Sequence, residues 1–397
     1  MKLFNTLTQS LEVLAPKDNT VRMYVCGVTP YDTTHLGHAF TYASFDTLSR
    51  YLESLGYTVN YVQNVTDIDD DILRKAREVG LSWDELGRRE TERYLNDMDA
   101  LNVRRPNVYA RATEETATMI EVIEGLLAGG YAYESSGNVY YSVRQDPDFG
   151  ALARAIGLND YPSMLTIANE RGNYPDDQRK QDPLDFVLWQ AQAPGEPAWP
   201  SPWGPGRPGW HIECSAMSMR YLGPQIDIHG GGADLAFPHH TCEIAQSEHF
   251  TGAVPFSRIW MHTGMVYQDG EKMSKSLGNL TLVSNLLKDH TAATIRVMLL
   301  NHHYRYPWEC FSEDLEVATE TTRLFQVVRE IVGDHTGDDD SMGSMLNNRF
   351  RAAMETDLNT PEAILLLRQA AEAAIKSRDL NTGGEVLRLA RMLGIPL

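Results

Sequence analysis

Apolar and polar positions in the first 65 residues predict a strand, a helix and a second strand. Residues 21–27 (VRMYVCG) are apolar and β-prone and are followed by Thr29-Pro30, which predicts a buried strand and then a loop. Residues 39–55 carry apolar side chains at helical spacing and end at Gly56, and residues 58–65 predict another strand. A strand, a helix and a strand in this order form a βαβ unit, which predicts a parallel sheet with crossover helices.

The rest of the pattern divides the chain into further parts. Residues 82–130 have a helical pattern, and a short alternating strand at 139–143 is followed by an irregular stretch rich in Pro, Gly and Asp. Residues 183–280 return to strands and turns, and the chain is almost wholly helical from 283 onwards. The predicted fold class is α/β, with three parts: a sheet domain over 1–100 and 182–282, an inserted connective subdomain over 101–181, and a helical bundle over 283–397.

Composition limits the classes of protein and partner. The chain has 397 residues, of which 42% are hydrophobic and 22% charged, so a packed core of two or three domains is expected. The first residues turn polar early and no apolar run is long enough to cross a bilayer, which predicts a soluble, cytoplasmic protein without a membrane partner. The net charge of −19 disfavours a large polyanionic partner, because tight nucleic-acid binding requires a basic face.

The motif His35-Leu36-Gly37-His38 lies between the first predicted strand and the first predicted helix. Gly37 lets a nucleotide approach the backbone, the helix N-terminus favours anionic groups, and two imidazoles can contact phosphate. A polar loop without function is the alternative for a motif of only four residues. The segment is therefore a candidate phosphate-binding site.

A second motif, residues 272–276 (KMSKS), lies in a Gly-flanked segment. Lys272 and Lys275 on such a loop can neutralise the charge that builds on a triphosphate while its α-phosphorus is attacked. A solvated surface loop is the alternative for this motif by itself. The KMSKS motif in the same chain as an HLGH motif at the head of a βαβ unit resembles the signature of class I aminoacyl-tRNA synthetases, which adenylate an amino acid with ATP.

Residues of metal-binding types are scattered along the chain. His239 and Glu243 lie four residues apart, so on a helix both project from one face. Cys26 and Cys214 can complete a tetrahedral site with two thiolates, an imidazole and a carboxylate. A role as small buried hydrophobic residues is the alternative for the cysteines. Two further residues are competing candidate ligands: His240 and Cys242.

With these residues, the sequence resembles the cysteinyl-tRNA synthetase family over nearly the whole chain. The matching runs are 24–27 (YVCG), 64–70 (NVTDIDD), 182–189 (DPLDFVLW), 206–217 (GRPGWHIECSAM) and 227–232 (DIHGGG). The resemblance implies a Rossmann-like nucleotide-binding catalytic domain. It also implies one zinc ion per chain that accepts the cysteine thiolate directly, and the implied ligands are Cys26, Cys214, His239 and Glu243. Zinc–thiolate bonding rejects serine better than a hydrophobic pocket does.

Several segments resemble a short paralogue in this family, the L-cysteine:glucosaminyl-inositol ligase of mycothiol biosynthesis. They are residues 29–39 (TPYDTTHLGHA), 61–67 (YVQNVTD), 262–265 (HTGM) and 170–172 (ERG) followed by Pro175-Asp176. The chain also stops after a helical segment that contains residues 357–363 (DLNTPEA), without the anticodon-reading domain of the synthetases. Together with the net charge, these features favour an amino-sugar acceptor, 1D-myo-inositol 2-amino-2-deoxy-glucopyranoside, over tRNA.

Other features favour the synthetase. Glu243 matches the fourth zinc ligand of the synthetases, and residues 274–279 (SKSLGN) are also synthetase-like. A truncated cysteinyl-tRNA synthetase is therefore one alternative, and a cysteine ligase with another amine acceptor is a second. A catalytically inactive paralogue that acts as a regulator or scaffold is a third alternative.

The resemblance implies a reaction and a set of site residues. The carboxylate of cysteine attacks the α-phosphorus of ATP, which is accompanied by Mg²⁺, and an acceptor amine then attacks the cysteinyl-adenylate. The implied catalytic residues are His35, His38, Lys272 and Lys275. The nucleotide and adenylate site is expected to include Gly27, Thr29, Gly37, Thr41, Asn64, Val65, Thr66, Trp210, Gly232, Ala233, Asp234, Val266 and Lys275. His211 and Asp234 are candidates for the general base, and a monomer is expected.

Overall fold

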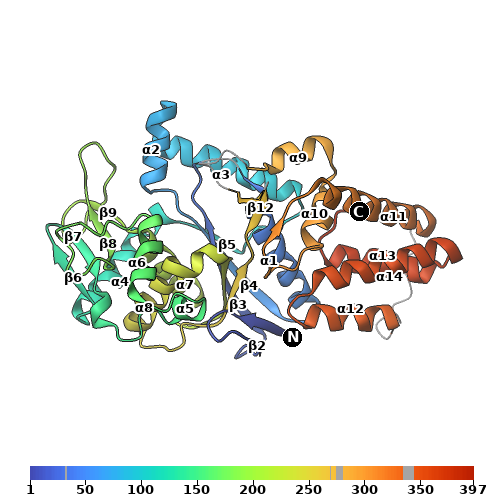
Figure 1. The fold of residues 1–397 in the computed structure, drawn as a ribbon, viewed down its shortest axis with the longest axis horizontal. Helices are drawn as coiled ribbons and strands as arrows, with labels where there is room; N and C mark the ends of the chain where they lie inside the picture. The colour runs from blue at the N-terminus through green and yellow to red at the C-terminus, as the bar shows by residue number, and fades with distance from the viewer. Residues whose placement is uncertain (32–33, 269, 274–279, 334–343) are drawn as a thin grey trace.

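A parallel sheet of five strands forms the centre of the molecule in the computed structural model (Figure 1). The structure describes residues 1–31, 34–268, 270–273, 280–333 and 344–397, with only the backbone of Lys272. The strand order is β11 (Ser257–Thr263), β10 (Ile226–Gly232), β3 (Thr20–Val28), β4 (Thr58–Val65) and β5 (Val108–Arg111), and neighbouring strands are parallel. The strands predicted at 21–27 and 58–65 are confirmed, as is the α/β class.

The sheet separates two hydrophobic cores because side chains alternate along each strand. On β3, Val21, Met23 and Val25 join the core that contains α1 (Leu36–Ser54). Tyr24 and Cys26 join the opposite core. That second core is formed with α4 (Thr116–Ala128), α7 (Trp210–Leu222) and α8 (Thr241–Thr251).

A smaller antiparallel sheet lies at one end of the molecule (Figure 1). Its strands are β6 (Ala132–Ser135), β7 (Asn138–Tyr141), β8 (Phe186–Ala191) and β9 (Gly206–Pro208), accompanied by α5 (Ala151–Ala155) and α6 (Tyr161–Glu170). Two of the strands precede residue 182 and two follow it, so this sheet crosses the predicted boundary of the insertion. The domain division itself stays a prediction.

The helical pattern predicted over 82–130 is wrong in part. Helices α2 (Asp70–Val79) and α3 (Trp83–Ala100) are followed by β5, which pairs with β4 at the edge of the central sheet. Helix α3 ends at Ala100, just before Asn102 takes a positive φ of 56°, and the short run before Ala112 gains its backbone partners from β4. Helices α7 and α8 were likewise not anticipated within 183–280.

The C-terminal part is helical, as predicted. Its helices are α9 (Val283–Asp289), α10 (Ala292–Leu300), α11 (Ser312–Val332), α12 (Met345–Glu355), α13 (Thr360–Ser377) and α14 (Leu380–Met392). A small sheet of β13 (Glu271–Lys272), β12 (Val266–Gln268) and β14 (Trp308–Glu309) links this bundle to the central sheet. An N-terminal hairpin of β1 (Lys2–Asn5) and β2 (Ser10–Val13) completes the fold. Among the described residues, no helix is long and apolar enough to span a membrane.

Candidate functional site

The candidate site lies where the order of strands in the central sheet reverses direction. From β3 the chain adds β4 on one side, whereas β10 pairs with β3 on the other. In open parallel sheets, ligands bind in the crevice at the carboxyl ends of the strands at such a point. Cys26 lies near the carboxyl end of β3, and Gly230 to Gly232 end the adjacent strand β10. Gly230 is required here because a Cβ atom would lie 2.2 Å from the ring of Phe45 on α1.

The structure brings the four predicted metal ligands together in this crevice. Cys26, Cys214, His239 and Glu243 are all buried, and one ligand atom from each lies within 4.8 Å of the others. Sγ of Cys26 is 3.4 Å from Oε1 of Glu243, and Nε2 of His239 is 3.2 Å from the same oxygen. The predicted one-face placement of His239 and Glu243 follows from their positions in the turn Ala236–His240 and the first turn of α8.

The donor set and its dimensions fit a tetrahedral metal ion. Bonds of about 2.0–2.3 Å in a tetrahedron place ligand atoms roughly 3.3–3.8 Å apart, and the two distances to Glu243 agree with this spacing. Oε2 of Glu243 is buried and lies 3.3 Å from Nε2 of His229, but it accepts no hydrogen bond from the described residues. A buried carboxylate oxygen without a hydrogen-bond donor is costly unless a cation binds nearby.

The electrostatics of the cluster also suit a metal ion. Burial raises the pKa of the Cys26 thiol well above its usual range and also raises the pKa of Cys214. Burial lowers the pKa of His239 well below its usual range, which keeps the imidazole in the neutral form that binds metals. The thiols therefore remain protonated until a metal ion replaces their protons.

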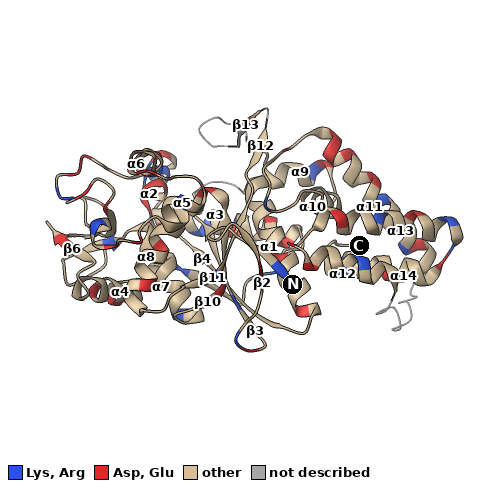
Figure 2. Cartoon of the chain, turned by 60° about the horizontal axis from the view of Figure 1, so that its bottom comes forward, with Lys and Arg blue, Asp and Glu red and all other residues tan. Residues whose placement is uncertain are grey.

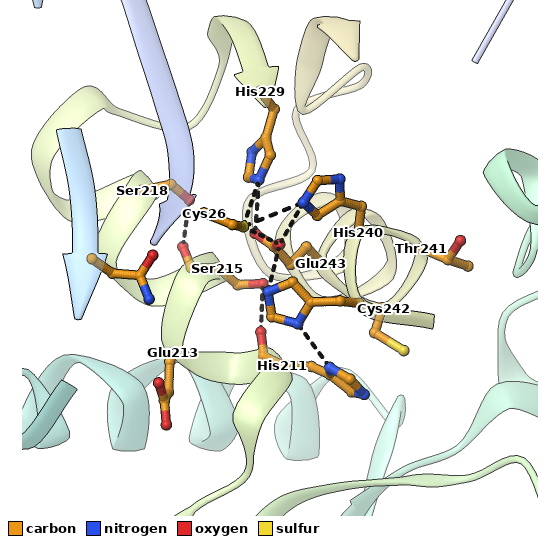
Figure 3. Close-up of polar contacts among 12 residues, drawn as sticks. Cys26, His211, Glu213, Ser215, Ser218, His229, His240, Thr241, Cys242 and Glu243 are labelled. Carbon is orange, nitrogen blue, oxygen red and sulfur yellow. Dashed lines mark hydrogen bonds and ion pairs between the residues drawn. The ribbon is translucent and has the colours of Figure 1, made fainter. Parts of the chain in front are cut away.

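Two further histidines contact this cluster (Figure 3). Nε2 of His240 is 3.3 Å from Sγ of Cys26, and Nε2 of His229 is 3.6 Å from the same sulfur. With Cys26 and Glu243, they form a second set of buried groups that can hold a metal ion. Cys242, the other competing candidate, belongs to neither set, and its thiol points away from the cluster in Figure 3.

His239 is held in place by aromatic neighbours. Its Nδ1 lies 2.9 Å from Nδ1 of His211, and its ring stacks on Trp210 with 4.3 Å between ring centroids. Burial lowers the pKa of His211 to about 3, so both imidazoles are neutral. These contacts leave Nε2 of His239 directed toward Glu243. A metal-ligating imidazole is commonly oriented through its other nitrogen in this way.

The N-terminus of α1 forms the other end of the site. His35 caps the helix by accepting a hydrogen bond from the backbone N–H of Gly37, and its ring stacks on His38 with centroids 3.7 Å apart. The backbone of His35 forms a bridge with Leu282. The predicted HLGH motif thus lies at a helix N-terminus, where the helix dipole favours anions.

The second motif is described only in part. Lys272 belongs to β13 and pairs with Tyr267 of β12. Met273 is buried, and its N–H donates to the carbonyl of Val266. Lys275 and the rest of 274–279 lie outside the described residues. Because Leu282 bridges to His35, the described residues that follow this segment lie next to the phosphate-binding candidate.

The remaining predicted adenylate-site residues surround the same crevice. Thr41 shares a 2.7 Å hydrogen bond with Thr263, and Asp234 contacts Arg171 with 3.4 Å between Oδ2 and Nη1. The other predicted residues lie at the carboxyl ends of strands or just beyond them: Gly27, Thr29, Asn64, Val65, Thr66, Gly232, Ala233 and Val266. Their roles in binding an adenylate stay predictions.

Sequence reasoning missed two buried residues at this site, His229 and Glu213. His229 lies on strand β10, next to the residue that pairs with Val25 of β3. The strand is buried, so a polar residue inside it was the signal that could have identified His229. Glu213 is 1% exposed and precedes Cys214 on α7. A carboxylate directly before the candidate metal ligand Cys214 was the signal available there.

Comparisons with known proteins agree with the fold and the resemblance. The model of the class I (C) tRNA synthetase catalytic domain matches residues 12–320. A cysteine–tRNA ligase of Thermodesulfovibrio yellowstonii is 44% identical over 384 residues, covering 92% of this chain and 77% of that protein. An L-cysteine:1D-myo-inositol 2-amino-2-deoxy-alpha-D-glucopyranoside ligase of Kribbella flavida is 44% identical over 377 residues, covering 94% and 90%. The resemblance drawn from the motifs is confirmed.

Solved structures show the same fold at low sequence identity. Methionyl-tRNA synthetase of Mycobacterium tuberculosis, solved with methionyl-adenylate, has a TM-score of 0.68 at 16% identity, covering 94% of this chain and 90% of that one. A leucyl-tRNA synthetase of Agrobacterium radiobacter has a TM-score of 0.69 at 12% identity, covering 96% and 84%. The architecture is therefore that of class I aminoacyl-tRNA synthetases, with a Rossmann-like catalytic domain.

Proposed function

This chain belongs to the cysteinyl-tRNA synthetase family, and we propose on that premise that it activates L-cysteine with ATP and transfers it to an amine. The observation that carries this proposal is the buried cluster of two thiols, an imidazole and a carboxylate beside the N-terminus of α1. One end of the crevice can hold a thiophilic metal and the other a polyphosphate. A substrate joining a thiol to a carboxylate fits between them.

The metal proposed for the cluster is zinc, held by Cys26, Cys214, His239 and Glu243. When bound, zinc supplies a Lewis acid that holds a thiolate and discriminates against a hydroxyl. The protein contributes a dry site, because all four ligand residues are buried. His211 and Trp210 orient the imidazole of His239.

In the first step, a carboxylate oxygen of cysteine forms a bond to the α-phosphorus of ATP, and the bond to the pyrophosphate oxygen breaks. His35, Gly37 and His38 hold the triphosphate at the N-terminus of α1, where backbone N–H groups and the helix dipole favour anions. Lys272 and Lys275 neutralise the charge on the leaving pyrophosphate, and Mg²⁺ accompanies the nucleotide.

In the second step, a neutral amine attacks the carbonyl carbon of the adenylate. The bond to AMP breaks and the amine loses a proton, which gives an amide. We favour an amino-sugar, glucosaminyl-inositol, as the acceptor. Arg171 of the ligase-like ERG element donates to Asp234, and both side chains are partly exposed, so a hydrogen-bond donor and an acceptor lie side by side. Such a pair suits a polyhydroxylated substrate.

The charge distribution also favours a small acceptor. The net charge is −19, and basic residues on the bundle are interspersed with acidic ones (Figure 2). Arg368 pairs with Glu320, and Arg351 pairs with Glu355. Charges paired in this way offer little attraction to a polyanion.

The second candidate function is the charging of tRNA with cysteine. The observation that favours it is Glu243, a synthetase-like residue that lies within the candidate metal cluster. A cysteine ligase with a different amine acceptor would use the same adenylate chemistry and differ only in the second step.

One set of incubations separates these functions. Cysteine-dependent exchange of pyrophosphate into ATP measures the first step, and serine replaces cysteine as the control. Cysteine and ATP are then incubated with either glucosaminyl-inositol or cysteine tRNA. We expect the amide and no robust aminoacylation. Charging of tRNA without amide formation would reverse the choice of acceptor, and absence of exchange would contradict cysteine activation.

A pair of variants tests whether Arg171 contributes to binding of the acceptor. Arg171→Ala is expected to slow amide formation by about tenfold, the effect of one charged hydrogen bond. Arg179→Ala is the matched control, because this arginine of the same segment pairs with Asp177 instead. Equal rates for the two variants would argue against a role for Arg171 in acceptor binding.

A further inference from the structure

A directed chain of hydrogen bonds joins three elements beside the metal cluster. The backbone N–H of Gly27 donates to Oδ1 of Asn64 at 2.7 Å, and Nδ2 of Asn64 donates to Oγ1 of Thr66 at 3.2 Å. The Thr66 hydroxyl donates to Oε2 of Glu213 at 2.7 Å. The direction is fixed because a backbone N–H can only donate, which orients the Asn64 amide and leaves the threonine proton for the carboxyl group.

The chain of hydrogen bonds connects the two segments that carry the thiols. Gly27 directly follows Cys26 on β3, and Glu213 directly precedes Cys214 on α7. Asn64 and Thr66, at the end of β4, bridge the gap between them. The contact with β4 is tight, since a Cβ atom at Gly27 would lie 1.7 Å from the carbonyl oxygen of Asn64.

Glu213 lies deep in the protein without serving as a metal ligand. Its exposed fraction is 1%, and its side chain points away from the metal cluster in Figure 3. Burial raises the pKa of Glu213 well above its usual range, and the nearby charges of Asp67 and Asp69 act in the same direction while Arg207 opposes them. Burial of an acidic group in this environment destabilises the fold, so a hydrophobic residue at this position would give a more stable protein.

We propose that Glu213 is a positioning residue for the metal centre. As the final acceptor of the hydrogen-bond chain, it holds the backbones of Cys26 and Cys214 at the separation that one ion requires. Support behind the ligands commonly changes metal affinity by about 10–100-fold. The effect on zinc does not depend on the proposed function, whereas the effect on cysteine rests on it.

The variants separate the hydrogen bond from the charge. Glu213→Leu removes the acceptor, whereas Glu213→Gln keeps an oxygen that accepts from Thr66. Thr66→Val removes the donor at nearly constant volume. Ser218→Ala is the control for a change elsewhere on α7, because this buried serine donates to the carbonyl of Ser215 outside the chain of hydrogen bonds.

The primary measurement is zinc affinity by competition with a chelator. Glu213→Leu and Thr66→Val are each expected to weaken zinc binding about 10–100-fold, whereas Glu213→Gln stays within about threefold of the wild type. The double variant Thr66→Val/Glu213→Leu is expected to be no weaker than either single variant, because both remove one interaction. Ser218→Ala is expected to bind zinc like the wild type.

A second measurement uses pyrophosphate exchange. In Glu213→Leu the KM for cysteine is expected to rise by about tenfold while the KM for ATP changes less than twofold. A purely structural defect would affect both constants and the melting temperature together. If the wild-type protein shows no exchange, the proposed function fails, but zinc affinity still tests the positioning role.

Several results would overturn the inference. Unchanged zinc affinity in a folded Glu213→Leu protein would do so, as would a Glu213→Gln protein as weak as Glu213→Leu. If Glu213→Leu does not fold, Thr66→Val provides the same test, and normal zinc affinity in that variant overturns the proposal. Additive losses in the double variant would also contradict a single chain of interactions.

Discussion

Two buried polar regions of this protein differ in how well their groups are satisfied. In the metal cluster, Oε2 of Glu243 lies 3.3 Å from Nε2 of His229 but accepts no hydrogen bond from the described residues, and Nδ1 of His229 has no hydrogen-bond partner among them. At the junction between the catalytic domain and the bundle, Arg296 is fully buried and also surrounded by polar groups. Its guanidinium donates to the carbonyls of Leu101, Asn102 and Leu393, to Thr47 and to Asp46.

The difference separates structural polar groups from functional ones. Asp46 in the junction accepts from Arg296, from Arg50 and from the backbone of Arg104, so its charge is compensated within the protein. The Glu243 carboxylate of the cluster contacts the imidazoles of His229, His239 and His240, and no Lys or Arg of the described part of the chain pairs with it. Buried polar groups in folded proteins are almost always paired. Thiols, imidazoles and a carboxylate gathered without a Lys or Arg among the described residues therefore suit a metal ion.

The largest effect is expected on zinc affinity, when one ligand of the metal cluster is removed. Cys214→Ser should lower zinc affinity by on the order of a thousandfold or more, because soft sulfur ligands dominate zinc binding. Cysteine-dependent exchange should be lost with the metal. Metal analysis of the purified variant and chelator competition provide the measurement. Full zinc content together with full exchange activity would remove Cys214 from the ligand set.

Substitution of Arg296 at the junction should instead lower the free energy of unfolding. Arg296→Met leaves the Asp46 carboxylate buried without its main cation, which costs about 3–5 kcal/mol. Denaturant unfolding of the variant measures this loss. Arg351→Met is a suitable control because this arginine forms an exposed pair with Glu355. Equal unfolding free energies of the two variants would show that the buried ion pair contributes no more to stability than the exposed one.

Lys275→Ala should leave both buried regions intact and slow only the chemistry. We expect the barrier to pyrophosphate exchange to rise by about 2–4 kcal/mol, as for loss of a preorganised charge at a developing anion. Zinc content and unfolding free energy should not change. Rates at saturating cysteine and ATP provide the measurement, and an unchanged rate would mean that the motif is not catalytic.

A pair of neutralising substitutions sharpens the comparison. Glu243→Gln should weaken zinc binding but raise the metal-free unfolding free energy by about 1 kcal/mol, because it removes a buried charge that contacts imidazoles but no Lys or Arg among the described residues. Asp46→Asn should lower the unfolding free energy, because it removes the partner of Arg296. Thermal unfolding in the presence of a chelator tests both. If Glu243→Gln destabilised the metal-free protein, the proposed difference between the metal cluster and the junction would be contradicted.

The smallest effect is expected for Cys242→Ser. Cys242 directly precedes Glu243 but belongs to neither candidate ligand set, so zinc affinity should stay within about twofold of the wild type. The same chelator competition used for Cys214→Ser makes the two cysteines directly comparable. Loss of the metal from the Cys242→Ser protein would show that the ligand set is wrong.

Local pattern was sufficient for the first βαβ unit and for the C-terminal helices. Residues 58–65 have the composition of a buried strand, and the structure contains β4 over the same residues. Strand β5 was missed because its four residues are too short to stand out, and its partner β4 lies more than forty residues earlier in the chain. The small sheet with β8 and β9 was missed as a unit because its strands come from distant segments.

The metal ligands show the same division. The spacing of His239 and Glu243 follows from helical geometry and was visible in the sequence. Cys26 and Glu243 are 217 residues apart, and no local spacing relates them. Only the resemblance to a family joined the four ligands before the structure did.

The sequence by itself determined the central βαβ unit, the HLGH and KMSKS motifs and the family, because each depends on residues close together in the chain. The tertiary structure decided which buried groups meet at the carboxyl ends of β3, β4 and β10. It placed His229 and His240 against Cys26, and it linked Gly27 through Asn64 and Thr66 to Glu213. Parallel strands bring distant segments to one edge, and that convergence has no periodic signal in the sequence.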